Sequence, residues 1–402
     1  MLIAAAFLTA TSAMGPGFLT QTAQFTAQYL ASLSFGIVIV IIMDMIAQTN
    51  VSSVIGASGM HAQELYGRLS RPLGFVFIVL ISVGGLTFNV GNVGGTALGL
   101  EAMTGLDQRI GILLGGALCI CVFLSRTGTK VMDTIAKVMG IAILLCVLYL
   151  CIASQPPVGL VAQKLFAPNN AENLISPMCT LLGGSCGGYI IFSGAHRLID
   201  AGYGGNKEDV SLFRKSSVVS VAVSGTVRIL LFLCVLAVCY IGTEPSPERI
   251  STIVNADNPA ATAFRVELGD MGYRLFGIAL FAASVTSVIG ATYTTVSFLK
   301  TLHPAIAKNE RWFCIGIIVI STIMILAFGS IKEVMIFVGA LNAAILPLSL
   351  VSSLIVSGNK KLVGENYRHP KVLYILGWVV AAVAVYIFVT SVMGVGRQLS
   401  GA

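Results

Sequence analysis

The stretch GPGFLTQTAQ at residues 15–24 decides the fold, because it sets a glycine–proline break and a polar run inside a long apolar segment. A second stretch, GGSCGG at residues 183–188, interrupts another apolar segment further along the chain. Irregular or polar backbone at membrane depth is tolerated only where it is buried in protein or lines a cavity. Two interrupted spans, each opening one half of a five-plus-five arrangement, therefore predict a transporter binding site. The alternative is that the glycines only allow helices to pack closely.

The composition excludes a soluble protein. Apolar types make up 56% of the 402 residues and charged types 10%, and the mean hydropathy is +0.91. A soluble domain carries about 25% charged residues. So little charge cannot solvate the surface of a chain this long, whereas a lipid-facing surface needs none. The net charge of +7 does not indicate nucleic acid, because the basic residues form short clusters between apolar runs.

Apolar windows long enough to cross about 30 Å of hydrocarbon recur along the chain. We expect eleven membrane spans, at residues 3–31, 34–57, 73–101, 108–125, 132–153, 175–196, 216–241, 273–299, 312–329, 331–356 and 372–394.

The lysine and arginine residues predict the side of the membrane on which each loop lies. If the N-terminus is inside, sixteen of the 24 basic residues fall in inside loops, seven fall in outside loops, and Arg228 lies within a span. Cytoplasmic loops carry the excess of positive charge. We therefore expect a multi-pass protein of the cytoplasmic membrane with its N-terminus inside and its C-terminus outside. The longest loop, residues 242–272, then lies outside.

Several motifs resemble those of the NRAMP proteins, which are proton-coupled transporters of manganese, iron and related divalent metals. GPGFL at residues 15–19 is similar to the start of their first span, and ALFAA at 279–283 with SVIG at 287–290 is similar to their eighth. GNKKLVG at 358–364 and GWV at 377–379 look like their tenth loop and eleventh span. The resemblance covers essentially the whole chain.

The resemblance implies an all-α polytopic fold of the LeuT type, from the APC superfamily. Such a fold is an inverted repeat of five plus five spans with broken first and sixth helices, followed here by an eleventh span. The first repeat would occupy residues 1–153, the second residues 154–357, and the eleventh span with the C-terminus residues 358–402.

The metal ligands of the family are replaced in this chain. In the register of the resemblance, Gln21 and Gln24 stand at the Asp and Asn of the family's D-P-G-N motif. Gly187 and Tyr189 stand at the Met and His of its M-P-H motif. A divalent cation that leaves water needs anionic or soft ligands. Neutral amide oxygens suit at best a cation that stays largely hydrated.

Arg228 lies near the middle of the seventh span, where an unpaired charge costs on the order of 2.5–3.5 kcal/mol, so a partner is expected. Its guanidinium would repel a metal ion and attract a carboxylate, for which bidentate geometry is available. Helix N-termini at the two breaks would add positive potential. The alternative is an internal salt bridge with Asp44, the acid deep in the second span. Both hold if a substrate anion competes with Asp44.

Few residues qualify as coupling or pathway groups. The family's third span carries acidic residues linked to proton flow, in D-L-A-E, whereas this chain has Asn89 and Asn92 in NVGN at residues 89–92. Asp44 is the visible coupling acid. His196 closes the sixth span and is a candidate proton relay, with an ordinary loop histidine as the alternative.

Two substrates remain open. The first is a small carboxylate-bearing solute, such as an amino acid or organic acid, bound by Gln21, Gln24, Gly187, Tyr189 and Arg228. The second is a divalent cation such as Mn²⁺ or Mg²⁺, as the resemblance alone implies. We expect the first, moved by alternating access with H⁺ or Na⁺ coupling.

An enzyme is not expected. No nucleophile–base pair, phosphate-binding loop, H-E-x-x-H motif or acid cluster is visible within the spans. We predict a transporter with no cofactor and no nucleic-acid partner that works as a monomer in the lipid bilayer.

Overall fold

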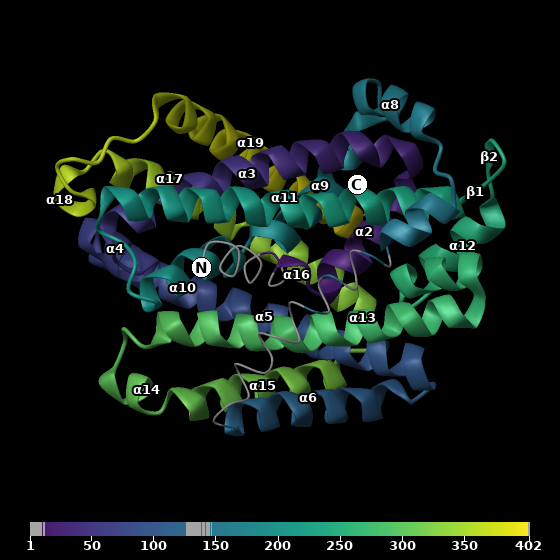
Figure 1. Ribbon diagram of the computed structural model, residues 1–402, viewed down its shortest axis with the longest axis horizontal. Coiled ribbons are helices and arrows are strands. Elements are labelled where there is room, and N and C mark those ends of the chain that lie inside the picture. Colours follow the sequence, from purple (N-terminus) through teal and green to yellow (C-terminus); the bar gives the residue numbers. More distant parts are fainter. Residues whose placement is uncertain are drawn as a thin grey trace.

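The computed structural model describes residue 10, residues 13–125, residues 138, 141 and 145, and residues 147–400. This part of the chain is nearly all helical, and its long helices run side by side (Figure 1). In it, eight helical segments are long and apolar enough to cross a membrane, and one further apolar helix has 17 residues. The predicted fifth span, 132–153, and the start of the first, at residue 3, lie largely outside the described residues.

The first half of the chain begins with two helices joined by a short turn. They are α2 (Pro16–Tyr29) and α3 (Leu33–Ser58), with the 3₁₀ turn η1 (Leu30–Ser32) between them, and together they hold the first two predicted spans. Next come α4 (Ala62–Leu69), α5 (Arg71–Thr104) and α6 (Gln108–Leu124). Gly59 and Gly105 end α3 and α5 in the left-handed region, with φ of +65° and +76°, which glycine adopts without strain.

The second half continues with spans six to eight and their loops. It contains α8 (Val158–Phe166), η2 (Ala171–Leu174), α9 (Ile175–Cys186), α10 (Ile190–Asp200) and α11 (Lys207–Val238). A two-stranded antiparallel hairpin, β1 (Tyr240–Ile241) and β2 (Glu244–Pro245), leads to α12 (Pro247–Asn255) and α13 (Pro259–Leu299). Thus the predicted outside loop, 242–272, is largely structured, and α13 is interrupted at Gly269, just before the predicted eighth span.

The chain ends with spans nine to eleven. Its elements are α14 (Pro304–Lys308), α15 (Glu310–Ala327), α16 (Ile331–Ala343), α17 (Ile345–Ser357), α18 (Lys360–Val363) and α19 (Lys371–Ser400). The predicted tenth span, 331–356, corresponds to α16 and α17 together.

Both predicted breaks are present, but each is shorter than the sequence suggested. The first lies at Gly15, whose backbone is extended, and the polar run at residues 20–24 is regular helix within α2. The second lies between Cys186 and Ile190, where Gly187 is extended and Gly188 has a φ of +58°. Only glycine enters that second conformation readily, so Gly188 sets the position at which span six breaks.

The other glycines of span six have the packing role that was the alternative interpretation. A Cβ atom on Gly183 would overlap the backbone of α16 at Gly339, and one on Gly184 would overlap the Gln21 side chain. Small residues of this kind let membrane helices approach closely, because packing rather than water exclusion holds them together. Both interpretations of the glycine-rich stretch are therefore correct, for different residues within it.

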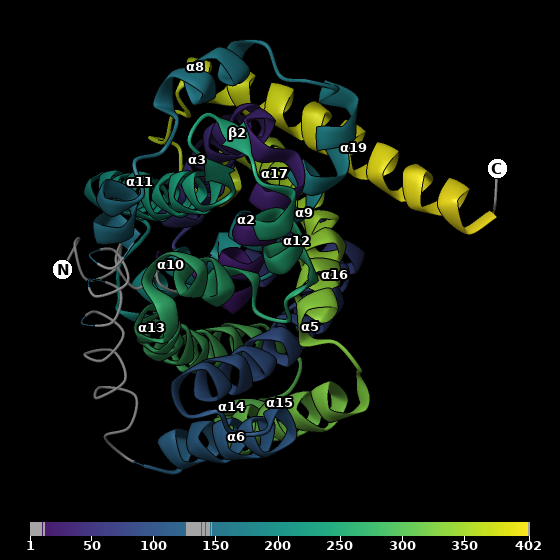
Figure 2. The ribbon, with the colours of Figure 1, turned by 90° about the vertical axis from the view of Figure 1, so that its right-hand side faces the viewer.

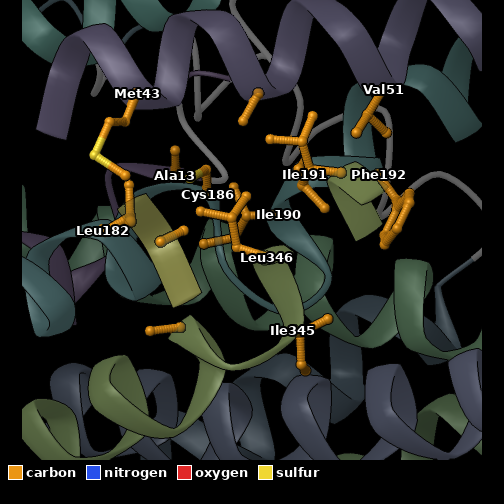
Figure 3. Packing of buried hydrophobic residues seen from close by; sticks show 14 of the residues in the cluster. Ala13, Met43, Val51, Leu182, Cys186, Ile190, Ile191, Phe192, Ile345 and Leu346 are labelled. Carbon is orange, nitrogen blue, oxygen red and sulfur yellow. The ribbon is translucent and has the colours of Figure 1, made fainter. Parts of the chain in front are cut away.

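The helices form layers around the broken spans. α5 packs extensively on α13, α11 packs on α3, and α16 packs on α9. Figure 2 shows α2 and α9 near the centre of the bundle, α6 and α15 at one margin, and α19 extending outward at another. Apolar side chains such as Met43, Leu182, Ile190 and Leu346 fill the space around the break of span six (Figure 3).

Loops that the charge count assigns to one side of the membrane lie at one end of the molecule. α4, α14 and α18, from predicted inside loops, lie at the left of Figure 1, and the β1–β2 hairpin and α12 lie at the right. The alternation of loop sides is thus as expected. Which end faces the cytoplasm stays a prediction, and so does the division into repeats at residues 153 and 357.

Candidate functional site

Gln21 lies where three helices meet, and its side-chain amide is completely buried. Its Nε2 donates to the backbone carbonyl oxygen of Met335 in α16 at 2.7 Å. Cβ atoms on Gly184 in α9 or Gly339 in α16 would overlap the amide. The amide therefore fits only because glycines flank it on both neighbouring helices.

Several amide oxygens around the breaks have no hydrogen-bond donor in the described structure. They belong to Gln21, Gln24, Asn89 and Asn342, all at most 5% exposed. A buried acceptor left unsatisfied costs on the order of 1–3 kcal/mol. These oxygens are thus positioned to accept from a donor that the described residues do not supply.

The two asparagines of span three contact different partners. Asn89 Nδ2 donates to Thr292 Oγ1 of α13 at 2.6 Å. Asn92 lies near the buried Tyr189 hydroxyl at the break of span six, and its Nδ2 has no hydrogen-bond partner among the described residues. The Asn92 side chain also lies next to Gly15 at the break of span one. Of the pair, Asn92 therefore lies close to both breaks, and Asn89 joins spans three and eight.

Arg228 is only 1% exposed and contacts both broken spans from α11. Its Nη1 donates to the Leu181 carbonyl oxygen of α9 at 3.3 Å. Its guanidinium carbon lies 4.1 Å from the centre of the Phe18 ring of α2, a cation–π contact. Its Nε and Nη2 have no hydrogen-bond partner in the part of the chain that is described.

The internal salt bridge considered for Arg228 is not formed. Asp44 is buried in α3, and among the described residues no Arg228 nitrogen lies within 4.0 Å of its carboxylate. Instead, Gln48 Nε2 donates to Asp44 Oδ1 at 2.7 Å, and the side chains of Ser185 and Cys186 at the end of α9 lie close to the carboxylate. Gln48 thus provides the hydrogen bond to Asp44, and the two opposite charges remain near neighbours without contact.

Gly187 cannot carry a longer side chain in this arrangement. A Cβ atom there would lie against the backbone carbonyl oxygens of Gly183 and Asn342. A thioether at this position, as in the metal-site motif of the resemblance, would require α9 and α16 to separate. The described residues also contain no group of three His, Cys, Asp or Glu side chains that could hold a metal ion.

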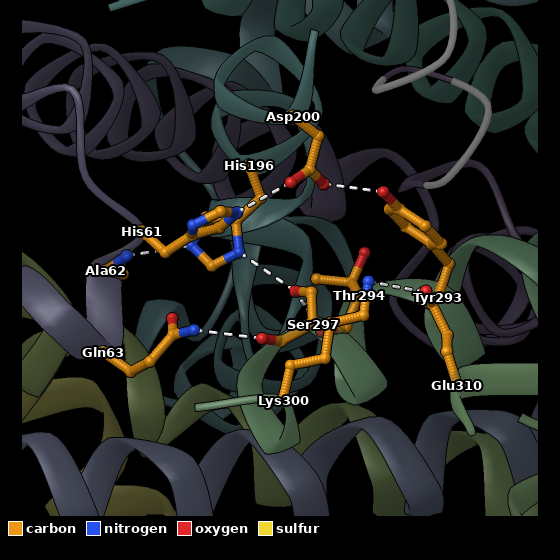
Figure 4. A network of polar contacts seen from close by, with 10 residues as sticks. All are labelled: His61, Ala62, Gln63, His196, Asp200, Tyr293, Thr294, Ser297, Lys300 and Glu310. Carbon is orange, nitrogen blue, oxygen red and sulfur yellow. Dashed lines mark hydrogen bonds and ion pairs between the residues drawn. The ribbon is translucent and has the colours of Figure 1, made fainter. Parts of the chain in front are cut away.

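His196 is not a loop residue, which corrects the alternative interpretation. It lies in α10, 1% exposed, and its ring stacks on Phe298 with centroids 4.8 Å apart. Its Nε2 accepts from the Ala62 backbone N–H at 3.1 Å, so Nδ1 carries the proton and donates to Ser297 Oγ at 3.2 Å (Figure 4). Both nitrogens are engaged, and a role for His196 in coupling stays a prediction.

Beside His196 lies a polar network that the sequence did not predict (Figure 4). Asp200 at the end of α10 accepts from the Tyr293 hydroxyl of α13 at 2.6 Å. Its other oxygen lies 3.0 Å from Nε2 of His61, which precedes α4. The network ties three elements that are distant in sequence, so no local pattern reveals it. Asn342 was also not predicted as a site residue. A single amide within an apolar span is a pattern from which the sequence could have revealed it.

The broken spans, the buried polar groups between them and the surrounding helices define a multi-pass membrane transporter. The chain belongs to the Nramp family: the model for natural resistance-associated macrophage protein-like proteins matches residues 6–394. The family predicted from the sequence is thereby confirmed, and with it the assignment of the chain to transporters.

Two bacterial relatives are similar over nearly their full length. An uncharacterized membrane protein YcsG of Bacillus subtilis is 40% identical over 395 residues, which cover 98% of this chain and 93% of the relative. An uncharacterized membrane protein of Haemophilus influenzae is 41% identical, with 95% and 93% covered. The divalent metal cation transporter MntH of Yersinia pestis is 22% identical, with 96% and 92% covered.

Solved structures share the fold. The crystal structure of a mutant of the Eremococcus coleocola manganese transporter matches with a TM-score of 0.78 at 20% identity, covering 100% of this chain and 87% of that one. The nucleobase-cation-symport transporter MHP1, with bromovinylhydantoin bound, matches with a TM-score of 0.58 at 16% identity, covering 98% and 89%. This likeness confirms the LeuT-type architecture. The metal cargoes named here support the divalent-cation alternative of the sequence analysis better than the carboxylate that we expected.

Proposed function

We propose that this Nramp-family protein is a secondary transporter that moves a small carboxylate-bearing solute by alternating access at the breaks of spans one and six. The observation that supports this substrate is the free edge of Arg228. Nη1 is used by Leu181, whereas Nε and Nη2 are buried without a partner in the described structure. Those two nitrogens form the side of a guanidinium that matches the two oxygens of a carboxylate.

The energetics of burial favour such a ligand. A buried cation without a counter-charge is strongly destabilising, and removing one partner of a buried ion pair costs about 3–5 kcal/mol. Asp44 does not contact Arg228, and its Oδ1 instead accepts a hydrogen bond from Gln48 Nε2. A substrate carboxylate would supply the missing acceptor and would draw binding energy from a group that is already positioned.

The amide oxygens narrow the class of substrate. Gln21 and Gln24 lie on α2, the helix whose Phe18 ring covers Arg228, and their Oε1 atoms lack donors in the described structure. A solute with an N–H or O–H group beside its carboxylate would satisfy acceptor and donor groups together. Amino acids and hydroxy acids therefore fit the site better than simple fatty acids do.

A divalent cation is the second candidate, and the named relatives support it more directly, since those with a named cargo carry metal. MntH of Yersinia pestis and the Eremococcus coleocola protein are a divalent metal cation transporter and a manganese transporter. The unpaired amide oxygens favour it here, because oxygen atoms are the ligands that hard cations prefer. Without a carboxylate among them, the ion would keep much of its water.

The fold by itself does not separate the two candidate substrates, since the MHP1 structure carries an organic ligand.

The substitution Arg228→Lys separates the carboxylate from the divalent cation, because it keeps the positive charge and removes the planar pair of guanidinium N–H donors. Losing one or two charge-assisted hydrogen bonds, each about 1.5–3 kcal/mol, should weaken carboxylate binding and uptake in proteoliposomes at least tenfold. Lys215→Gln, exposed on the same helix, is the matched control and should transport normally.

Direct binding of metal ions tests the divalent cation as the substrate. Titration calorimetry with Mn²⁺ and Mg²⁺ should give no saturable heat if the substrate is a carboxylate. Saturable heat that disappears in Gln21→Ala, together with unchanged carboxylate uptake in Arg228→Lys, would replace the carboxylate by a cation as the substrate.

A further inference from the structure

A cavity of about 390 Å³ lies away from the proposed substrate site, where α17 ends and α19 begins. The segment from α18 to the first residue of α19 contributes Lys360, Arg368 and Lys371 to its lining. Tyr374 and Ile375, from the first turns of α19, complete it on the other side. The cavity therefore has a cationic wall and an apolar wall.

The cationic wall is not neutralised by the protein. All three basic side chains are exposed, and in the described part of the chain no carboxylate lies within 4.0 Å of them. The nearest acid along the connection, Glu365, lines a neighbouring cavity of about 550 Å³, which Arg214 and Arg368 also line, and no Glu365 oxygen lies within 4.0 Å of a nitrogen of either arginine. Burial, together with the positive charge of Arg214, lowers the pKa of His369, which also lines the 390 Å³ cavity, to about 4.

The apolar wall continues into a surface suited to lipid. Val372, Ile375 and Val379 of α19 are 71%, 62% and 53% exposed. The rings of Tyr374 and Trp378 lie 6.2 Å apart on the same part of the helix. Tyrosine and tryptophan gather at the level of lipid headgroups, so the cavity lies where the headgroup region meets the hydrocarbon.

We propose that this cavity binds the headgroup of an anionic phospholipid whose acyl chains lie along α19. Three cations match a phosphodiester and its surroundings, and basic pockets between membrane helices are suited to anionic headgroups. A soluble anion would use the same cations, but it would leave the adjoining apolar face of α19 without an occupant. The charge count assigns this end of the bundle to the cytoplasmic leaflet.

The bound lipid would also brace span two against span eleven. His369 Nε2 lies 2.8 Å from Asn50 Oδ1 of α3, and Asn50 Nδ2 donates to the Leu373 carbonyl oxygen at 3.1 Å. These contacts attach the connection to the helix that carries Asp44. Ordering of the connection by a lipid should therefore raise the thermal stability of the whole protein.

Native mass spectrometry and thermal unfolding of the detergent-purified full chain test the proposal. Phosphatidylglycerol should bind and raise the midpoint of unfolding, and phosphatidylcholine and inorganic phosphate should do neither. In Lys360→Gln with Lys371→Gln, phosphatidylglycerol should bind about 25-fold more weakly, since each lysine contributes about a factor of five near an anionic surface. Lys361→Gln, whose side chain is exposed but does not line the cavity, should bind normally.

Two results would overturn the proposal. One is unchanged phosphatidylglycerol binding in the double variant. The other is inorganic phosphate that binds wild type and not the double variant, because the site would then serve a soluble anion. Lys360→Arg with Lys371→Arg preserves the charge and should restore lipid binding, which separates loss of the site from loss of folding.

Discussion

Gln21 illustrates how single residues define the centre of this protein. Its amide is held by one hydrogen bond to Met335 and by two glycines that leave no room for a methyl group. An aspartate would be isolated there, since the described surroundings offer no cation at hydrogen-bond distance from this side chain. The site is thus built for a neutral amide, and the positive charge is supplied separately by Arg228.

Gly184→Ala tests this fit. The added methyl group would overlap Gln21 Oε1, and overpacking of this kind costs about 1–3 kcal/mol. We expect a lower midpoint of thermal unfolding and weaker substrate binding. Gly316→Ala in α15 is the control, because nothing described lies within 4 Å of its new methyl group and alanine favours a helix by about 1 kcal/mol. Equal effects of the two substitutions would contradict the packing argument.

At the scale of elements, polar contacts fasten α10 and the connection before α19 to other helices. α10, the second half of span six, is tied through Asp200 to His61 before α4 and to Tyr293 of α13. The connection before α19 is tied to α3 through His369. Alternating access requires elements of this kind to separate, so both contacts are expected to influence the balance between conformations.

Tyr293→Phe removes one of these ties without changing the shape of the ring. A hydrogen bond to a charged acceptor contributes about 1.5–3 kcal/mol, less here because Asp200 is partly exposed. We expect faster amide exchange at the end of α10, measured by hydrogen–deuterium exchange. Tyr386→Phe, exposed on α19, should leave the exchange unchanged. Unaltered exchange in both variants would show that the hydroxyl does not hold the two helices together.

His369 should make stability depend on pH. Asn50 Nδ2 is a donor, so Asn50 Oδ1 accepts from His369 Nε2–H, and Nδ1 accepts from the Tyr367 hydroxyl at 2.6 Å. The pKa of His369 is lowered to about 4, first by burial and then by Arg214. Between about pH 6.5, where an unfolded histidine titrates, and pH 4, the unfolded state binds a proton that the folded state does not. The free energy of unfolding therefore decreases as the pH is lowered through this range.

The expected loss is on the order of 1 kcal/mol, because the ring is partly exposed and its charge is screened. Unfolding midpoints recorded from pH 7 to pH 4 should fall less steeply in His369→Gln than in wild type. If the midpoint fell equally steeply with pH in both proteins, the His369 ring would already bind its proton in the folded protein.

At the scale of the whole molecule, the loops separate into two ends, with α18 at one and the β1–β2 hairpin at the other (Figure 1). The positive charges distinguish these ends, and a transporter needs that asymmetry to be inserted in one direction. α8 carries Phe166, which is 87% exposed, on a predicted outside loop.

Cysteine labelling in intact cells tests the orientation. A membrane-impermeant maleimide should label Phe166→Cys from outside and should label Lys361→Cys only after the cells are opened. Wild type provides the background, because the chain already contains nine cysteines. The reverse pattern would invert the topology and would place the lipid cavity in the outer leaflet.

Local patterns predicted most of the architecture. The spans and the breaks at Gly15 and Gly187 were evident because hydropathy and glycine conformation depend on neighbouring residues alone. The extent of the breaks was overestimated: the polar run of span one is helical, because other helices satisfy or enclose its side chains. Polarity by itself does not unwind a helix that is surrounded by protein.

The sequence by itself determined that the chain crosses the membrane many times, belongs with the Nramp proteins and lacks the acids and sulfur of their metal site. Only the tertiary structure decided which polar groups meet. It left the Nε–Nη2 edge of Arg228 free among the described residues, turned Asp44 toward Gln48 and enclosed His196 between aromatic rings. The reason is that these contacts join helices far apart in the chain, and their geometry depends on how closely the glycines allow those helices to approach.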